Sequence, residues 1–210
     1  MKVKVCGMRD PENIRQVAAL LPDFMGFIFY NASKRFAGNH ITPELLASLP
    51  ASIQKIGVFV NESTEVIKET VALNKLNLVQ LHGSETPRQC QEIHDAGIKV
   101  IKAFSVGDGF SFQSTLLYER SCDYFLFDTR GKQYGGNGVV FDWELLKGHI
   151  ADKPYFLSGG LNLENLKSIE FNKLRPKPFA VDVNSGFEQE PGLKKVQELR
   201  QLFEELKVKH

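Results

Sequence analysis

The chain has 210 residues, 42% of them hydrophobic, and its 26 lysines and arginines nearly balance its 25 aspartates and glutamates. This composition is that of a globular protein with room for a buried core, and it lacks the basic excess of nucleic-acid-binding proteins. No apolar run approaches the ~18 residues of a membrane span, and charge returns at Arg9 and Asp10 before a signal-peptide core could form. We therefore expect neither a nucleic-acid partner nor a membrane partner.

Short apolar runs alternate with helix-start patterns along the whole chain. The expected strands cover residues 3–6, 24–29, 56–60, 78–81, 98–104, 124–127, 155–157 and 179–183. The expected helices cover 11–21, a segment from 43, 66–71, 86–96, 111–118, 142–147, a segment from 162, and 193–206. The last of these helices has the clearest apolar face.

Several of the expected helices begin with a recognisable cap. Asp10-Pro11 and Thr42-Pro43 each place an N-cap residue before a proline at the first helical position. Thr86 and Gln89 have the spacing of a capping box. These caps separate each strand from the helix that follows it.

Eight strand–helix units in 210 residues leave about 26 residues per unit, close to the minimum for a strand, a crossover helix and two loops. Strict alternation predicts a parallel sheet. Eight units predict that this sheet closes, so we expect an α/β fold: one (β/α)8 TIM barrel over residues 1–210, with eight parallel strands and outer helices. An open doubly wound sheet is the alternative, but the first strand is not followed by its GxGxxG turn.

In a barrel of this type the functional residues lie at the carboxyl ends of the strands. Gly159 and Gly160 follow the seventh expected strand, and Ser185 and Gly186 follow the eighth. Glycines there either make tight turns or let backbone N–H groups approach an anion. Because the two loops are neighbours, we favour a phosphate site.

Two further residues at strand ends have side chains suited to acid–base chemistry. Cys6 ends the first strand, where it is either a small buried apolar residue or a thiolate that acts as a base. Asp128 ends an apolar strand, as a turn cap or as a carboxyl that stays protonated and acts as an acid. The Arg35 guanidinium could bind a carboxylate through two hydrogen bonds, or it could be a solvated surface group. His82 could make a structural hydrogen bond, or it could act as an acid or base.

The cysteines and histidines do not suggest a metal centre. Cys6, Cys90 and Cys122 are far apart, and the five histidines follow no short metal-binding spacing. We expect no disulfide framework, no metal and a cytoplasmic location.

A set of motifs in fixed order resembles the phosphoribosylanthranilate isomerase family, the (β/α)8 enzymes of the third step of tryptophan biosynthesis from chorismate. The matching stretches are 4–8, 26–29 with 33–35, 57–61, 79–83, 127–128, 135–138 with 141–143, 157–162 and 182–186. This resemblance implies an Amadori rearrangement of N-(5-phosphoribosyl)anthranilate to 1-(2-carboxyphenylamino)-1-deoxyribulose 5-phosphate, an aldose–ketose isomerisation without metal or organic cofactor. The implied partner is this phosphosugar alone, bound by a monomer or homodimer.

The resemblance also implies a role for each matching residue. Cys6 corresponds to the family's general base and Asp128 to its general acid. Arg35 corresponds to the arginine that holds the anthranilate carboxylate. The implied substrate-binding residues of the late loops are Gly136, Gly159, Gly160, Asp182, Asn184, Ser185 and Gly186.

Three positions depart from the family's common pattern. Lys34 replaces a proline, Asn137 replaces a threonine in the glycine-rich loop, and Lys195 replaces an acidic residue on the last helix.

Two other functions remain possible interpretations of the sequence. Another phosphosugar barrel, such as an epimerase or an indole-glycerol-phosphate synthase, would need a metal-ligand set or a catalytic lysine, for which Lys102 is the candidate. A non-catalytic phosphosugar-binding barrel would not need both Cys6 and Asp128.

Overall fold

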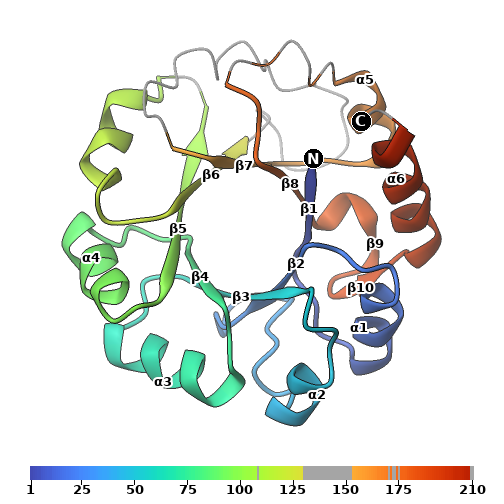
Figure 1. Cartoon of the computed structure of the whole chain (residues 1–210), viewed down its shortest axis with the longest axis horizontal. Coiled ribbons are helices and arrows are strands. Elements are labelled where there is room, and N and C mark those ends of the chain that lie inside the picture. The colour runs from blue at the N-terminus through green and yellow to red at the C-terminus, as the bar shows by residue number, and fades with distance from the viewer. Residues whose placement is uncertain (108, 130–152, 170, 172–173, 175, 209–210) are drawn as a thin grey trace.

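The computed structural model describes residues 1–107, 109–129, 153–169, 171, 174 and 176–208. Eight parallel strands form a closed barrel in chain order, and the last strand pairs with the first (Figure 1). The strands are β1 (Lys2–Val5), β2 (Phe24–Ile28), β3 (Gln54–Phe59), β4 (Leu78–Leu81), β5 (Lys99–Val106), β6 (Tyr124–Thr129), β7 (Tyr155–Ser158) and β8 (Ala180–Val183). The predicted barrel is therefore confirmed, and the open sheet was the wrong alternative.

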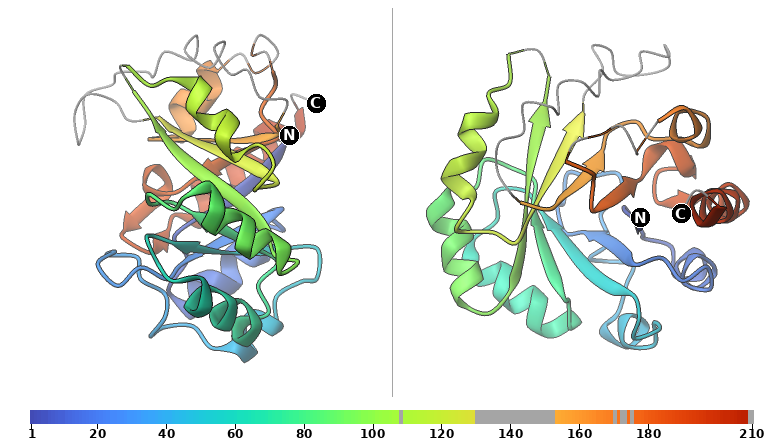
Figure 2. Two further views of the ribbon diagram at one scale, coloured as in Figure 1. Left: turned by 90° about the vertical axis from the view of Figure 1, so that its left-hand side faces the viewer. Right: turned by 45° about the horizontal axis from the view of Figure 1, so that its top comes forward.

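Helices surround this barrel on its outside (Figure 2). They are α1 (Pro11–Ala18), α2 (Pro43–Ala47), α3 (Thr64–Asn74), α4 (Pro87–Asp95), the 3-10 helix η1 (Phe112–Tyr118), α5 (Leu163–Ser168), the 3-10 helix η3 (Ser185–Phe187) and α6 (Val196–Val208). A small antiparallel hairpin, β9 (Glu188–Glu190) and β10 (Leu193–Lys194), follows η3. The predicted glycine-rich loop at 135–138 and the helix at 142–147 lie outside the described residues.

The caps predicted from the sequence begin the helices as expected. The Asp10 carboxylate accepts a hydrogen bond from the Asn13 N–H at 2.7 Å, and the Thr42 hydroxyl accepts one from the Leu45 N–H at 3.2 Å. Thr86 caps α4 in the same way. Gln89, however, does not complete a capping box, because its side-chain amide donates to the Glu62 carbonyl at 2.7 Å and so connects α4 to the loop between β3 and α3.

Some sequence predictions were wrong at the ends of elements. We expected Leu21 on the apolar face of the first helix, but α1 ends at Ala18, and Leu21 has φ 55° and is 60% exposed. We expected Leu193 on the last helix, but it lies in β10. Neither the hairpin nor the 3-10 form of η1 was predicted, because local apolar spacing does not distinguish a 3-10 turn or a short hairpin from a helix.

Alternation along the strands divides the core into two layers. Residues of one parity fill the barrel, and those of the other parity pack against the helices. At the amino ends of the strands the interior is aromatic: the Phe24 and Phe156 rings lie 5.2 Å apart and the Tyr124 and Phe179 rings 5.0 Å apart. At the carboxyl ends the interior has polar side chains, such as Gln80, Asp128 and Asp182, beside the apolar Ile28 and Val58, so that end is the one suited to a ligand.

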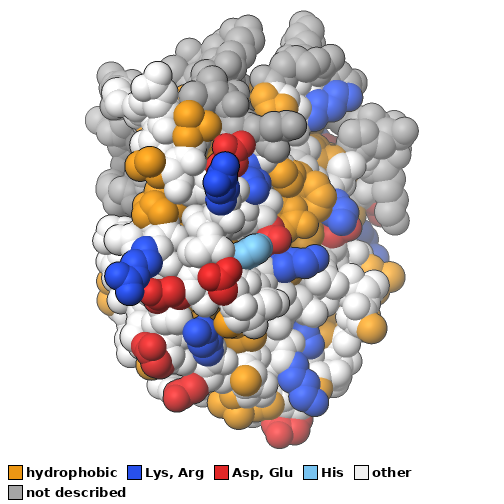
Figure 3. Space-filling model, turned by 60° about the vertical axis from the view of Figure 1, so that its left-hand side comes forward, with side chains coloured by type: hydrophobic (Ala, Val, Ile, Leu, Met, Phe, Trp, Pro, Cys, Tyr) orange, Lys and Arg blue, Asp and Glu red, His pale blue; other side chains and the backbone are white. Residues whose placement is uncertain are grey.

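The outer surface reflects the balanced composition. On the face shown in Figure 3, positive and negative side chains are interspersed. Among the described residues, no helix combines the length and the apolar character that a membrane crossing requires.

Candidate active site

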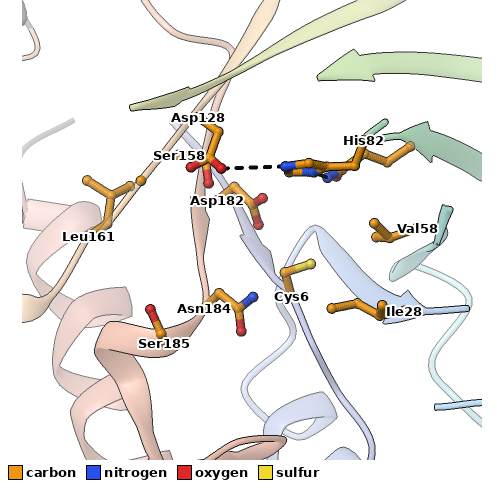
Figure 4. A pocket seen from close by; sticks show the side chains of 13 residues that line it. Cys6, Ile28, Val58, His82, Asp128, Ser158, Leu161, Asp182, Asn184 and Ser185 are labelled. Carbon is orange, nitrogen blue, oxygen red and sulfur yellow. Dashed lines mark hydrogen bonds and ion pairs between the residues drawn. The ribbon is translucent and has the colours of Figure 1, made fainter. Parts of the chain in front are cut away.

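A cavity of about 200 Å³ opens at the carboxyl ends of the strands. It brings together eight of the residues singled out from the sequence, as Figure 4 shows for most of them. They are Cys6, His82, Asp128, Gly159, Gly160, Asp182, Asn184 and Ser185. The cavity also contains Gln80, so β1, β4, β6, β7 and β8 all contribute to it.

Strand parity places two reactive side chains of the first strand in the barrel. Val3 and Val5 pack outward against the helices, so Lys4 and Cys6 point inward. Gly26 on β2 makes room for them, because a Cβ there would lie 2.8 Å from Cys6 Sγ and 3.2 Å from Lys4 Cε. A larger residue at position 26 would displace the thiol from the cavity.

Lys4 is a buried cation beneath the cavity that the sequence analysis did not single out. Its Nζ donates to Asp182 Oδ2 at 2.9 Å and to Gln80 Oε1 at 2.8 Å, and its side chain is fully buried. Burial by itself lowers the pKa of Lys4, but the Asp182 carboxylate and Cys6 outweigh it and raise that pKa. Lys4 therefore stays charged. Its inward parity, shared with Cys6, was the sequence pattern that could have revealed it.

Cys6 lies in an environment that resists ionisation of its thiol. Burial raises the pKa of Cys6, Lys4 acts against that rise, and Asp182 adds to it. A thiolate at this position therefore depends on the charge of Lys4.

Asp182 has one carboxylate oxygen satisfied and one that is not. Oδ2 accepts from Lys4, whereas Oδ1 is buried and has no hydrogen-bond partner among the described residues. Burial raises the pKa of Asp182 and Lys4 opposes this rise. Because a buried acceptor without a donor is costly, Oδ1 is placed to accept a hydrogen bond from a ligand in the cavity.

Asp128 faces the same cavity from the end of β6. Its Oδ2 lies 3.4 Å from His82 Nε2, and its side chain is 24% exposed. Figure 4 shows the two side chains facing each other across the cavity. Asp182 interacts electrostatically both with Cys6 and with Asp128. The candidate base and the candidate acid thus share one small cavity, as the sequence analysis required.

A second buried ion pair fixes the loop after His82 from outside the barrel. Glu85 accepts hydrogen bonds from the backbone N–H groups of Asn61 and Gly83, both at 2.9 Å. Lys102 Nζ lies 3.0 Å from Glu85 and also donates to the Gly83 carbonyl at 2.8 Å. Lys102 is absent from the residues that line the cavity, so it does not supply the catalytic lysine of the alternative interpretation.

The loop after β7 has a backbone geometry that requires its glycines. Gly159 and Gly160 have φ of 107° and 61°, a region that residues with a Cβ rarely adopt. Gly186 differs from the others, because it does not line the cavity. A Cβ there would overlap the Leu161 carbonyl oxygen, so this glycine lets the eighth loop pack against the seventh.

Arg35 lies beside the cavity without lining it. A Cβ on Gly7, the residue after Cys6, would lie 2.8 Å from Arg35 Cδ and 2.7 Å from Asn184 Oδ1. The guanidinium is bound by Glu188, with Nε at 2.9 Å from both carboxylate oxygens and Nη2 at 2.6 Å from Oε2. The third guanidinium nitrogen, Nη1, is hydrogen-bonded to none of the described residues.

The hairpin that the sequence did not predict supports Arg35 and Asn184. Lys194 on β10 donates to Glu188 Oε1 at 2.6 Å and to Asn184 Oδ1 at 2.7 Å. Burial alone would raise the pKa of Glu188, but Arg35 and Lys194 hold it below its ordinary range. Lys194 was missed because the pattern at 193–206 suggested a continuous helix, and Glu188 was missed because its partner Arg35 is 153 positions away in the sequence.

Of the predicted site residues, only Gly136 lies outside the described part of the chain. Within that part, no group of three or more His, Cys, Asp and Glu side chains is arranged to hold a metal ion. The cavity offers a thiol, two carboxyls and an imidazole for its chemistry, and the buried Lys4 ammonium lies beneath it.

Known proteins are similar to this chain in sequence and in fold. A family model for N-(5'-phosphoribosyl)anthranilate (PRA) isomerase matches residues 3–205. The N-(5'-phosphoribosyl)anthranilate isomerase of Parabacteroides distasonis is 44% identical over 98% of this chain and 93% of its own, and that of Phocaeicola vulgatus is 43% identical over 100% and 99%.

Two solved structures show the same similarity. Phosphoribosyl anthranilate isomerase from Thermotoga maritima is 36% identical, with a TM-score of 0.88 over 99% of each chain. A structure of such an isomerase in complex with reduced 1-(o-carboxyphenylamino)-1-deoxyribulose 5-phosphate is 35% identical, with a TM-score of 0.83 over 99% of each chain.

Proposed function

Since the chain belongs to the N-(5'-phosphoribosyl)anthranilate isomerase family, we propose that its cavity binds that phosphosugar, with Cys6 as general base and Asp128 as general acid. The chain is an aldose–ketose isomerase of tryptophan biosynthesis. The observation that carries the assignment of roles is the presence of a thiol and a carboxyl in one cavity of about 200 Å³.

The first step opens the sugar ring and requires an acid. The bond between C1 and the ring oxygen breaks, its electron pair goes to that oxygen, and the Asp128 carboxyl supplies the proton. The amine nitrogen then forms a double bond to C1, which gives a cationic Schiff base. Asp128 is left as a carboxylate, and the partly exposed position of its side chain lowers the cost of that charge.

The second step requires a base on the other side of the sugar. The cationic nitrogen makes the C2 hydrogen acidic, and the Cys6 thiolate removes it to give an enolamine. The enolamine gains a proton at C1 and loses one from its C2 hydroxyl, which gives the ketone. Lys4 supports this step because its ammonium favours the thiolate that burial disfavours.

The remaining site residues hold the ends of the substrate. The backbone of Gly159 and Gly160, together with Ser185, binds the phosphate, and Asp182 Oδ1 accepts a hydrogen bond from a sugar hydroxyl. Arg35, fixed by Glu188, binds the anthranilate carboxylate at the edge of the cavity. Gripping both ends fixes the sugar between acid and base, which lowers the entropic part of the barrier.

Kinetics of two variants test the assigned roles. We expect Cys6→Ala and Asp128→Asn each to lower kcat at least ~100-fold, the lower range of loss for a general acid or base. Cys90→Ala is the matched control for the thiol, because Cys90 is equally buried but lies on α4 outside the barrel. Asp95→Asn is the control for the carboxyl. Wild-type turnover in either catalytic variant, with a native circular dichroism spectrum, would contradict its role.

The setting of the reaction is also part of this proposal. We infer one barrel domain acting as a monomer or homodimer in the cytoplasm, without metal or organic cofactor. The free thiols of Cys6, Cys90 and Cys122 suit a reducing compartment.

A further inference from the structure

A chain of polar side chains crosses the barrel from the buried Lys4 and Gln80 to the partly exposed His82 and Asp128. Lys4 Nζ donates to Gln80 Oε1 at 2.8 Å, Gln80 Nε2 lies 2.7 Å from His82 Nδ1, and His82 Nε2 lies 3.4 Å from Asp128 Oδ2. The side chains come from β1, β4, the residue after β4, and β6. The donor and the acceptor of each contact in this chain of side chains follow from the chemistry of the groups, starting from Lys4.

The lysine decides the orientation of the Gln80 amide. An ammonium has only hydrogens to donate, so the Gln80 atom that it meets is the carbonyl oxygen. Gln80 is 1% exposed, which leaves its amide no water to compensate for a reversed orientation. The Gln80 NH2 group therefore faces His82.

The Gln80 amide in turn decides the tautomer of His82. An NH2 group only donates, so His82 Nδ1, 2.7 Å away, must accept and carries no hydrogen. A neutral imidazole then has its hydrogen on Nε2, the nitrogen that faces Asp128. A second proton on Nδ1 would place two hydrogens between Nδ1 and Gln80 Nε2, so the imidazolium form requires the Lys4–Gln80 contact to break.

We propose that Lys4, acting through Gln80, holds His82 as the neutral Nε2–H tautomer, so that the imidazole cannot take the Asp128 proton and its N–H faces the carboxylate that forms when Asp128 gives this proton to the substrate. This inference rests on the proposed function, in which Asp128 is the acid. Lys4, Gln80 and His82 are positioning residues here, because they act through Asp128.

The tautomer has two consequences for the ring-opening step. Asp128 faces a nitrogen that already bears a hydrogen, so it cannot lose its proton to the imidazole and must deliver it to the ring oxygen. When the Asp128 O–H bond breaks, the new carboxylate meets the His82 N–H at Oδ2. The distance of 3.4 Å is long for a hydrogen bond, and such contacts commonly tighten once substrate is bound.

The other charged groups around His82 make this restraint necessary. Asp128 on β6 and Asp182 on β8 face His82, and both carboxylates would favour a positively charged imidazole. Lys4 on β1 lies beyond Gln80 and opposes that charge, and Cys6 lies in the same cavity. A histidine without the Gln80 contact would therefore pair with Asp128 as an imidazolium and remove the acid.

Nitrogen-15 NMR of the imidazoles in the intact protein measures the tautomer directly. We expect His82 to show an unprotonated Nδ1 and a protonated Nε2 at about pH 8, where a histidine is ordinarily neutral. The signal is assigned by its loss in His82→Gln. Protonation of Nδ1 in the wild-type protein would overturn the inference.

Gln80→Glu reverses the polarity of the contact while preserving its shape. The new carboxylate still accepts from Lys4, but it now requires a hydrogen on His82 Nδ1, so we expect Nδ1 to become protonated and kcat to fall at least ~10-fold. An unprotonated Nδ1 or unchanged kcat in this variant would overturn the inference.

Two histidine variants separate donation to Asp128 from a merely structural role. His82→Gln keeps an N–H donor near the position of Nε2, whereas His82→Leu has none, so kcat should be at least ~10-fold higher in His82→Gln at similar KM. Equal kcat in the two variants would refute a donor role. His94→Gln is the control, because His94 lies on α4 and should leave kcat unchanged. Failure of the proposed function itself would appear separately, as full activity in Asp128→Asn.

Discussion

Replacing Lys4 by methionine removes the only hydrogen-bond donor that the Asp182 carboxylate has among the described residues. Both side chains are buried, at 0% and 4% exposure, so neither charge can turn to water. Breaking a buried ion pair by removing one partner costs about 3–5 kcal/mol. That is a large share of the ~5–15 kcal/mol that stabilises a typical domain.

Asp182 can avoid part of this cost by taking up a proton, so the loss depends on pH. Burial already raises the pKa of Asp182, and without Lys4 that pKa rises further above the unfolded value of about 3.9. The folded Lys4→Met variant then binds a proton that the unfolded chain releases. Its free energy of unfolding therefore falls as pH rises between the two pKa values, by up to ~1.4 kcal/mol per pH unit.

Urea unfolding followed by far-ultraviolet circular dichroism measures this effect. Near about pH 5 the variant should approach the wild type, and near about pH 8 it should show the largest deficit. The double variant Lys4→Met/Asp182→Asn carries neither charge and should be more stable than Lys4→Met at the higher pH. Lys195→Met is the control, because Lys195 lies on the surface beside Glu198 and should change stability by at most ~1 kcal/mol.

Two results would refute this reasoning. One is a deficit of Lys4→Met that stays the same at every pH, which would indicate lost packing instead of an unpaired charge. The other is a double variant that is no more stable than Lys4→Met at the higher pH, which would show that the two residues are not coupled through charge.

Three further predictions concern the rest of the site. Arg35→Ala should raise KM or lower kcat/KM by ~10–100-fold, as expected for a lost hydrogen bond to a charged group, and steady-state kinetics measures it. Because burial raises the pKa of Cys6, the thiol form dominates at neutral pH, and kcat/KM should increase with pH as the thiolate forms. Gly186→Ala forces a Cβ against the Leu161 carbonyl and should cost about 1–3 kcal/mol, seen as a lower Tm.

Each of these predictions has an outcome that would contradict it. Unchanged kinetics in Arg35→Ala would make this residue only a partner of Glu188. A pH–rate profile that is flat above neutral pH would argue against a buried thiol as the base. An unchanged Tm in Gly186→Ala would show that the two late loops can separate without cost.

The barrel was predictable because its determinants are local. Each strand is a short apolar run and each start of α1, α2 and α4 carries a cap that its own neighbours satisfy, as the Asp10 and Thr42 hydrogen bonds show. Cys6 and Asp128 were predictable for a related reason, since a parallel barrel collects all strand ends at one edge. Local spacing failed at ends of elements, as at Leu21 and Leu193, and it did not predict the hairpin of β9 and β10 or the 3-10 form of η1.

The polar connections of the site depended on residues that are distant in the sequence. Lys4 meets Gln80 and Asp182 across 76 and 178 positions, and Arg35 meets Glu188 across 153. No local sequence pattern predicts such partners. A charged residue in a strand is expected to be exposed to solvent, and only closure of the barrel places its side chain in the interior. The amino-acid sequence by itself thus determined the barrel and which side chains would share its open end. Only the tertiary structure decided which of them are paired, buried or left with an unsatisfied oxygen, since these properties arise from burial among side chains brought together by folding.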